Sequence, residues 1–176
     1  LEEYRKIRAN QKDFISFCLN PEQASNVTIQ PITRYGFDAA IIFSDILMVP
    51  WALNRNVRFK TGIGPLLDPM ETPDEVDTSC LDGLIKKLAP VGQALELTRG
   101  ALPSETTLIG FAGAPWTLIT YMAEGGTSRD FLKARQWAWQ NAKALDGLLD
   151  ILVDATISFL SLQAQSGAQT LMLFDS

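Results

Sequence analysis

The chain has 176 residues, of which 47% are hydrophobic, which is enough for one domain with a core of its own. Its net charge of −5 argues against nucleic acid as the main partner, because phosphate binding needs a basic face. No apolar run reaches the roughly 18 residues that a membrane-spanning helix needs, and the absence of histidine excludes a Ser-His-Asp triad or a His-ligated zinc site within the chain.

The first predicted unit is a helix followed by a buried strand. Asn20 is a suitable N-cap, Pro21 suits the first helical position, and Gly36 ends the helix. The apolar run Ala39–Phe43 is typical of a short strand that is buried on both faces. Helix and strand therefore follow each other directly within residues 20–43.

Two further units repeat this order. Apolar residues at helical spacing over 88–98 precede the apolar run 107–111, and a longer helical stripe over 145–160 precedes the run 170–174. Helices that alternate with short apolar strands indicate a parallel sheet. Residues 49–78 are rich in Pro, Gly and Asp, and we expect them to form an irregular excursion within a single domain, 1–176. An open doubly wound sheet and a (β/α)8 barrel both fit this pattern.

Polar residues follow the predicted strands at the end where parallel sheets bind ligands. Asp45 follows the first strand between two apolar stretches, so its carboxylate either caps the next helix or serves chemistry. Tyr121 lies on the helix after the second strand, where the alternative is a half-buried core residue, and Ser176 follows the third strand. Arg8 shares one helical face with Arg5, which is either a solvated face or an anion site.

Other features have simple structural interpretations. Cys18 and Cys80 fit no metal or redox spacing, so we expect two reduced thiols in a cytosolic protein. The sequence GAPWT at 113–117 is either a Gly-Pro turn into a helix or a place where a planar ligand approaches the backbone. Phe14, Phe111 and Phe174 are most simply core residues, although the last two end strands and could line a pocket.

The chain resembles the uroporphyrinogen decarboxylases over its whole length. FSDIL at 43–47, GFAGAPWTL at 110–118, TYMAEGG at 120–126 and FDS at 174–176 occur in the order and spacing of that family. The resemblance implies a (β/α)8 TIM barrel, of which this chain would hold about the second to the fourth strand. It also implies that the chain is the N-terminal half of such an enzyme, truncated at both ends.

The same resemblance implies a function. Family members are carboxy-lyases of haem and chlorophyll biosynthesis that convert the four acetate side chains of uroporphyrinogen III into the methyl groups of coproporphyrinogen III, with no cofactor and no metal. Asp45 matches the catalytic aspartate that faces the pyrrole N–H groups, and Arg8, Tyr121 and Ser176 match positions that bind substrate. A homodimer in the cytoplasm, or in the plastid stroma of a photosynthetic eukaryote, is implied for the complete enzyme.

Two alternatives to this function remain. One is a corrinoid-linked methyltransferase of the same barrel superfamily, which a His-x-Cys motif in later strands would favour. The other is a non-catalytic half-barrel that only binds a tetrapyrrole, which binding without release of CO2 would reveal. This chain by itself is expected to be inactive, because three strands cannot close a barrel.

Overall fold

The computed structural model describes residues 1–76 and 78–175. A parallel sheet has the strand order β1-β4-β5, and a separate antiparallel hairpin pairs β2 with β3. The strands are β1 (Ala39–Ile41), β2 (Arg58–Lys60), β3 (Gly64–Leu66), β4 (Thr107–Gly113) and β5 (Thr170–Phe174). The helices are α1 (Glu2–Ala9), α2 (Phe14–Cys18), α3 (Pro21–Tyr35), α4 (Met48–Ala52), α5 (Leu81–Ala101), α6 (Pro115–Glu124), α7 (Leu132–Gln140) and α8 (Ala142–Gln165), with 3₁₀ turns η1 (Pro73–Glu75) and η2 (Thr78–Cys80).

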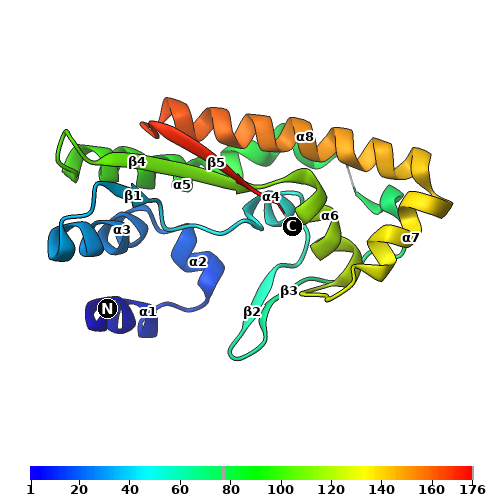
Figure 1. The fold of residues 1–176 in the computed structure, drawn as a ribbon, viewed down its shortest axis with the longest axis horizontal. Helices are drawn as coiled ribbons and strands as arrows, with labels where there is room; N and C mark the ends of the chain where they lie inside the picture. Colours follow the sequence, from blue (N-terminus) through cyan, green and yellow to red (C-terminus); the bar gives the residue numbers. More distant parts are fainter. Residues whose placement is uncertain (77, 176) are drawn as a thin grey trace.

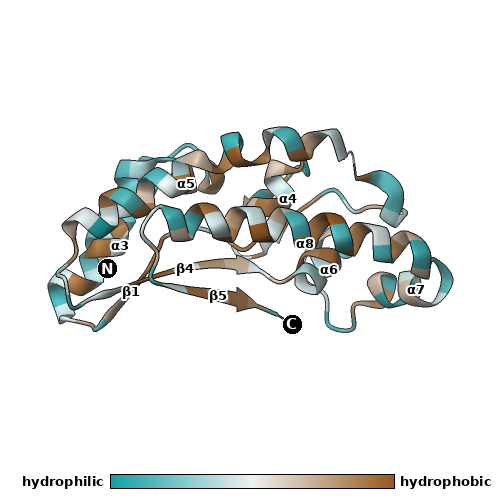
Figure 2. Ribbon diagram, turned by 90° about the horizontal axis from the view of Figure 1, so that it is seen from above, coloured by the Kyte–Doolittle hydropathy of each residue, from teal (hydrophilic) through white to brown (hydrophobic). Residues whose placement is uncertain are grey.

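The helices cover one face of the parallel sheet. In Figure 1, α8 lies above the sheet and α5 behind it, whereas α1, α2 and the β2-β3 hairpin lie below it (Figures 1 and 2). On the covered side, Ala40, Ile42, Leu108 and Ala112 are at most 3% exposed, so the core lies between the sheet and the helices. Within the part of the chain that the structure describes, no helix is long and apolar enough to cross a membrane.

Local sequence signals set the three helix–strand units as predicted. The Asn20 side chain accepts a hydrogen bond from the backbone N–H of Gln23, and Gly36 ends α3 in the left-handed conformation at φ 65°. Strand β1 stops at Ile41, two residues earlier than expected, whereas β4 continues to Gly113. The strand predicted over 170–174 is confirmed with those bounds.

β1 ends early because side chains replace the sheet hydrogen bonds beyond Ile42. The backbone N–H of Ile42 donates to the Ile109 carbonyl of β4, and the next N–H, that of Phe43, points to the other side and donates to the Thr28 hydroxyl at 2.8 Å. The fully buried Gln163 of α8 then satisfies the backbone of Phe111, accepting from its N–H and donating to its carbonyl, both at 2.8 Å. A Cβ on Gly110 would lie 2.5 Å from the Gln163 Oε1, so this glycine admits the amide. The chain after Phe43 is thereby free to turn away from the sheet.

The excursion predicted over 49–78 folds back onto α6. Backbone N–H groups of Leu67 and Met70 donate to the carbonyls of Gly125 and Met122, each at 2.9 Å. Gly125 has φ 80°, and a Cβ there would lie 3.0 Å from the Leu67 carbonyl, so the close approach requires glycine. This contact holds the β2-β3 hairpin beside the end of α6.

Candidate active site

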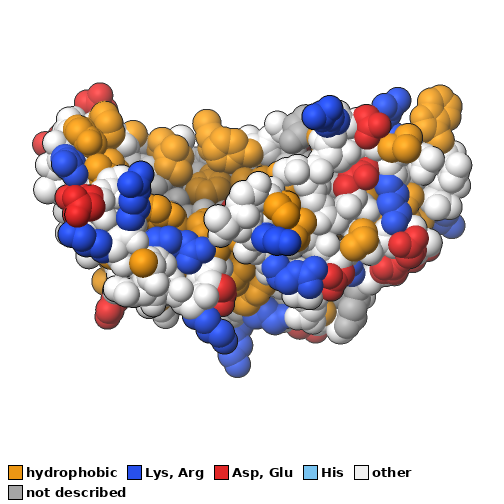
Figure 3. Space-filling model, turned by 90° about the horizontal axis from the view of Figure 1, so that it is seen from below, with side chains coloured by type: hydrophobic (Ala, Val, Ile, Leu, Met, Phe, Trp, Pro, Cys, Tyr) orange, Lys and Arg blue, Asp and Glu red, His pale blue; other side chains and the backbone are white. Residues whose placement is uncertain are grey.

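The uncovered face of the sheet forms the inner wall of the candidate site. The register pairs Ile41 with Ile109 and Phe111 with Met172, so these side chains point to the same face, opposite to Gly110 and the helices. Ile41 and Met172 are 51% and 45% exposed, and this side of the molecule has a hollow in which hydrophobic side chains gather (Figure 3). An apolar wall is therefore open to a ligand or to further chain.

Two phenylalanines lie on this wall toward the carboxyl ends of β4 and β5. Phe111 lies edge-to-face with Phe174 at a centroid distance of 5.5 Å, and Phe174 is 41% exposed. Phe111 is 8% exposed and belongs to the core, as its simpler interpretation predicts, whereas Phe174 ends β5 and is open to a ligand. An exposed aromatic face at this place suits the apolar ring face of a ligand.

Asp45 lies at the carboxyl end of the sheet, as predicted. A Cβ on Gly113, the last residue of β4, would lie 3.0 Å from the Ile46 carbonyl, so the Asp45–Ile46 segment passes directly over that strand end. One carboxylate oxygen, Oδ1, accepts the backbone N–H of Leu47 at 2.8 Å. The other accepts no hydrogen bond from the residues that the structure describes. The side chain thus supports the local turn and still has a free oxygen.

Burial changes the acidity of Asp45. Loss of solvent raises the pKa of its carboxyl from 3.8 to about 6, and the Leu47 N–H opposes this only in part. No ion pair involving Asp45 occurs in the described part of the chain. A half-buried carboxylate without a counter-cation is costly, which is typical of a functional group that awaits a partner.

Tyr121 is within electrostatic reach of Asp45. Burial raises the pKa of the Tyr121 phenol, and the negative charge of Asp45 raises it further. Tyr121 belongs to α6, which starts at Pro115 directly after β4, and the backbone N–H of Ala114 donates to the Phe174 carbonyl at 2.8 Å. The GAPWT sequence therefore acts at least as the turn into α6, and it brings Tyr121 to the same strand ends as Asp45.

Arg8 reaches the site from the N-terminal segment. Its guanidinium carbon lies 5.5 Å from the centroid of the Phe14 ring. The thiol of Cys18 is close enough to both Arg8 and Asp45 to feel their charges. Burial raises the pKa of this thiol, the charge of Asp45 raises it further, and the charge of Arg8 opposes that effect. Arg8 and Asp45 consequently lie on the same side of the molecule, whereas Arg5 on the same helix is exposed.

Ser176 lies outside the described residues, so its predicted place beside Asp45 stays a prediction. Its neighbour Asp175 accepts a hydrogen bond from the Thr117 hydroxyl at 3.0 Å, which ties the end of β5 to α6. Cys18 and Cys80 are both buried, and neither forms a disulfide within the described residues.

Sequence reasoning missed an aromatic cluster beside Asp45. Tyr4, Phe14, Phe17, Phe43 and Phe59 contact one another at centroid distances between 4.4 and 6.1 Å. Tyr4 belongs to α1, Phe14 and Phe17 belong to α2, Phe43 follows β1, and Phe59 belongs to β2. Nothing in the spacing of these residues in the sequence predicts that their rings meet. The cluster forms the side of the site on which Arg8 lies.

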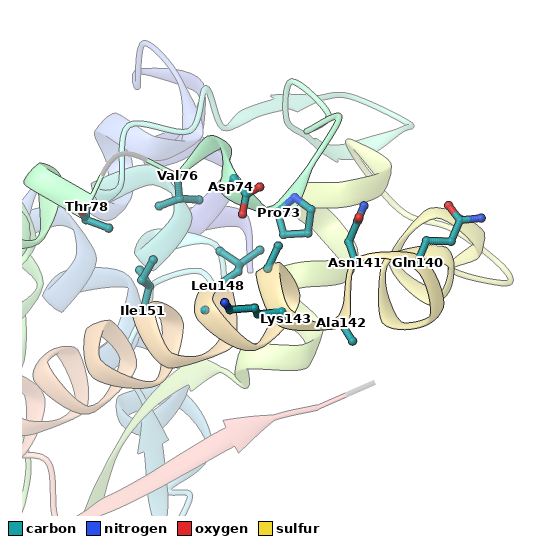
Figure 4. A pocket seen from close by; sticks show the side chains of 12 residues that line it. Pro73, Asp74, Val76, Thr78, Gln140, Asn141, Ala142, Lys143, Leu148 and Ile151 are labelled. Carbon is teal, nitrogen blue, oxygen red and sulfur yellow. The ribbon is translucent and has the colours of Figure 1, made fainter.

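A separate pocket does not belong to this site. It has a volume of about 670 Å³ and lies between η1 and the first turns of α8. Pro73, Asp74 and Val76 face Leu148 and Lys143 across it (Figure 4). None of Arg8, Asp45 or Tyr121 lines this pocket.

Comparisons with known proteins show the family of the chain. The model of the family described as uroporphyrinogen decarboxylase (URO-D) matches residues 1–176. The chain belongs to the uroporphyrinogen decarboxylase family. It is 50% identical to the uroporphyrinogen decarboxylase of Maricaulis maris over all 176 residues and 46% identical to that of Granulibacter bethesdensis. It covers 51% and 52% of those two proteins, so it spans about half the length of the curated relatives it matches.

A solved structure confirms the fold class. A methyltransferase from Methanosarcina mazei superposes with a TM-score of 0.74 over 89% of this chain and 46% of that one, at 16% sequence identity. With the parallel strand order, this likeness and the family membership show a partial (β/α)8 barrel rather than an open doubly wound sheet. The assignment of these strands as the second to the fourth of a uroporphyrinogen decarboxylase barrel stays a prediction.

Proposed function

We propose that this chain forms the half of a uroporphyrinogen decarboxylase that carries the catalytic aspartate. The observation that carries the proposal is Asp45, a half-buried carboxylate at the carboxyl end of the sheet with one oxygen free and no cation paired to it. Relatives that are 44–50% identical over the chain bear the name of this enzyme, which supports the same activity here.

The free oxygen of Asp45 suits the charge that this decarboxylation creates. Protonation of a pyrrole ring carbon gives an iminium-like cation, and the electron pair of the C–CO2 bond flows into that cation as CO2 leaves. The exocyclic methylene that results then takes a proton and becomes a methyl group, and the ring carbon loses the proton that it had gained, which restores the pyrrole. An ionised Asp45 accepts hydrogen bonds from the pyrrole N–H groups and stabilises the cation, by analogy with preorganised groups worth about 3–4 kcal/mol. The pyrrole itself accepts the electrons, so the proposal needs neither a cofactor nor a metal.

Arg8, Tyr121 and Ser176 are proposed to bind the substrate. Uroporphyrinogen carries eight carboxylates while this chain has a net charge of −5, so local cations must overcome an unfavourable field. Arg8 suits this task because a guanidinium fork binds a carboxylate through two parallel hydrogen bonds. Tyr121 supports the proposal through its closeness to Asp45, and Ser176 through its match to the family position.

The methyltransferase alternative has less support. The Methanosarcina mazei protein shares the fold at 16% identity, which gives no reason to assign a methyltransferase reaction to this chain. The curated relatives near 50% identity are named as decarboxylases. Homodimer formation, with a cytoplasmic or plastid location, is part of the proposal and rests on the family resemblance.

A hybrid enzyme tests the proposed function. This chain replaces the matching half of the Maricaulis maris decarboxylase, and the purified hybrid is incubated anaerobically with uroporphyrinogen III. We expect coproporphyrinogen III and CO2, because the chain supplies Asp45 in its native surroundings. The matched control carries an Asp154→Asn change, which alters an exposed carboxylate on α8 away from the site and should leave turnover unchanged. A hybrid that folds and binds uroporphyrinogen but releases no CO2 would support the non-catalytic alternative instead.

A further inference from the structure

The side chain that holds Arg8 is an aromatic ring instead of a carboxylate. The structure has ion pairs for Lys6, Arg34, Arg58 and Lys133, but Arg8 has no acidic partner within the described residues. Its guanidinium also donates no hydrogen bond within that part of the chain. The contact that defines its position is the Phe14 ring, 5.5 Å from the guanidinium carbon.

A ring contact leaves the guanidinium ready for a ligand. An aromatic face attracts a cation through its quadrupole, and it does so without using the N–H donors at the edge of the guanidinium plane. A carboxylate partner would occupy two of those donors and would have to be displaced by an incoming anion. Arg8 is therefore fixed in place while its hydrogen-bonding edge stays available.

The Phe14 ring is itself well supported. Its centroid lies 4.4 Å from that of Phe59 and 5.6 Å from that of Phe43. Phe43 stands two residues before Asp45, so the ring cluster connects the position of Arg8 to the position of the catalytic carboxylate. Asp13 fixes the start of α2, because its side chain accepts the backbone N–H of Ser16 at 2.7 Å.

Helix α1 has few other anchors that could orient Arg8. None of its residues is buried. Its ion pair to the body of the protein, Glu3 with Arg34 at 3.1 Å, is more than half exposed on both sides and contributes little. Tyr4 packs on Phe17 and Phe43, one turn away from Arg8. The orientation of the Arg8 guanidinium thus depends on Phe14.

We infer that Phe14 is a positioning residue that presents Arg8 to a carboxylate of the substrate. The inference rests on the proposed function and adds to it the residue that prepares the anion site. Because the Arg8–carboxylate contact is made equally in the bound substrate and in the transition state, loss of positioning should raise KM and leave kcat nearly unchanged.

A double-mutant cycle in the hybrid enzyme tests this role. The variants are Phe14→Leu, Arg8→Met and the double mutant, and KM and kcat for uroporphyrinogen III are measured for each. We expect Phe14→Leu to raise KM by about 3-fold, in line with the strength of a cation–ring contact, with kcat within two-fold of the unmutated hybrid. In the Arg8→Met background the same change should leave KM unaltered. Phe14→Tyr keeps the ring face and should keep KM.

Each other outcome has a definite meaning. If Phe14→Leu raises KM by the same factor with and without Arg8, Phe14 acts only through packing and the inference is wrong; an unchanged KM in the Arg8-containing hybrid contradicts it as well. If Phe14→Leu does not fold, which the thermal melting midpoint reveals, Phe14→Met removes the ring with less loss of packing and takes its place in the cycle. An unmutated hybrid that forms no coproporphyrinogen contradicts the proposed function itself, which separates the two failures.

Discussion

The contrast between two aspartates shows why Asp45 is the centre of the site. Asp68 accepts hydrogen bonds from Asn56 at 3.0 Å and from Arg58 at 2.8 Å, and these partners lower the pKa of its carboxyl. Its role is structural, because it holds the base of the β2-β3 hairpin. Asp45 has one backbone partner and a raised pKa. A carboxylate that the fold does not satisfy costs stability, which supports the catalytic role that we propose for Asp45.

Burial of the ionised Asp45 carboxylate destabilises the fold, so a variant without this charge should be more stable, by an amount that depends on pH. The pKa of Asp45 is about 6 in the folded chain against 3.8 for an unperturbed aspartate, so ionisation favours the unfolded state as the pH rises through this window. Asp45→Asn keeps the acceptor for Leu47 and removes the charge. Above pH 7 we expect the Asp45→Asn hybrid to have a free energy of unfolding about 1–3 kcal/mol larger than that of the unmutated hybrid. Below about pH 4 this difference in the free energy of unfolding should vanish.

Urea unfolding at pH 4, 6 and 8 measures this difference. Glu105→Gln, at an exposed loop, is a control that should show no such trend. The free energies of unfolding of the Asp45→Asn hybrid and the unmutated hybrid could instead differ by a constant amount from pH 4 to pH 8. That result would mean that a cation from the other half of the hybrid barrel neutralises Asp45.

At the scale of elements, the early end of β1 shapes the site and depends on Gln163. Replacing Gln163 by Met keeps the length of the side chain but leaves the buried backbone N–H and carbonyl of Phe111 without partners. We expect Gln163→Met to lower the free energy of unfolding of the hybrid by about 2–4 kcal/mol, because an unsatisfied buried polar group costs about 1–3 kcal/mol. Gln165→Met, at an exposed position two residues along the same helix, is the control and should change it by less than about 0.5 kcal/mol. Equal effects of the two changes would refute the assigned role.

Local signals made the helix–strand units predictable, and long-range contacts made the rest unpredictable. The cap at Asn20 and the left-handed Gly36 act within four residues of themselves, so the sequence predicts α3 closely. The end of β1 depends on Gln163, which is 52 residues from its partner Phe111 in the sequence. Asp45 was predictable as a polar residue after a strand, whereas the contact of Phe14 with Arg8 arises from two short helices whose packing no periodicity encodes.

At the scale of the whole molecule, the open sheet is the dominant feature. β1 and β5 are its edge strands, and the apolar residues Leu171–Phe174 of β5 are each between 41% and 53% exposed. Unpaired apolar edges are templates for association between chains. The chain spans about half the length of the relatives it matches, and in a closed barrel these edges would pair with further strands.

This chain expressed alone is therefore expected to associate or to lack fixed tertiary structure, and to form no coproporphyrinogen. Size-exclusion chromatography and binding of an apolar dye measure the first property. Leu173→Lys places a charge on the exposed edge strand and should raise the soluble fraction. Ser158→Lys adds the same charge on the exposed side of α8 and should raise it less. A soluble monomer that unfolds cooperatively and decarboxylates uroporphyrinogen would show that the account of the open sheet is wrong.

The most direct measurement for the whole account is the single-turnover rate of CO2 release in the hybrid enzyme with Asp45 changed. Asp45→Asn keeps the shape and the hydrogen bond to Leu47 but removes the negative charge opposite the protonated pyrrole. We predict that it lowers this rate by roughly 100-fold or more, as for loss of one preorganised electrostatic group. Asp45→Glu keeps the charge, displaced by one methylene, and should retain more activity than Asp45→Asn. Release of CO2 by Asp45→Asn at a rate near that of the unmutated hybrid would contradict the electrostatic role of Asp45.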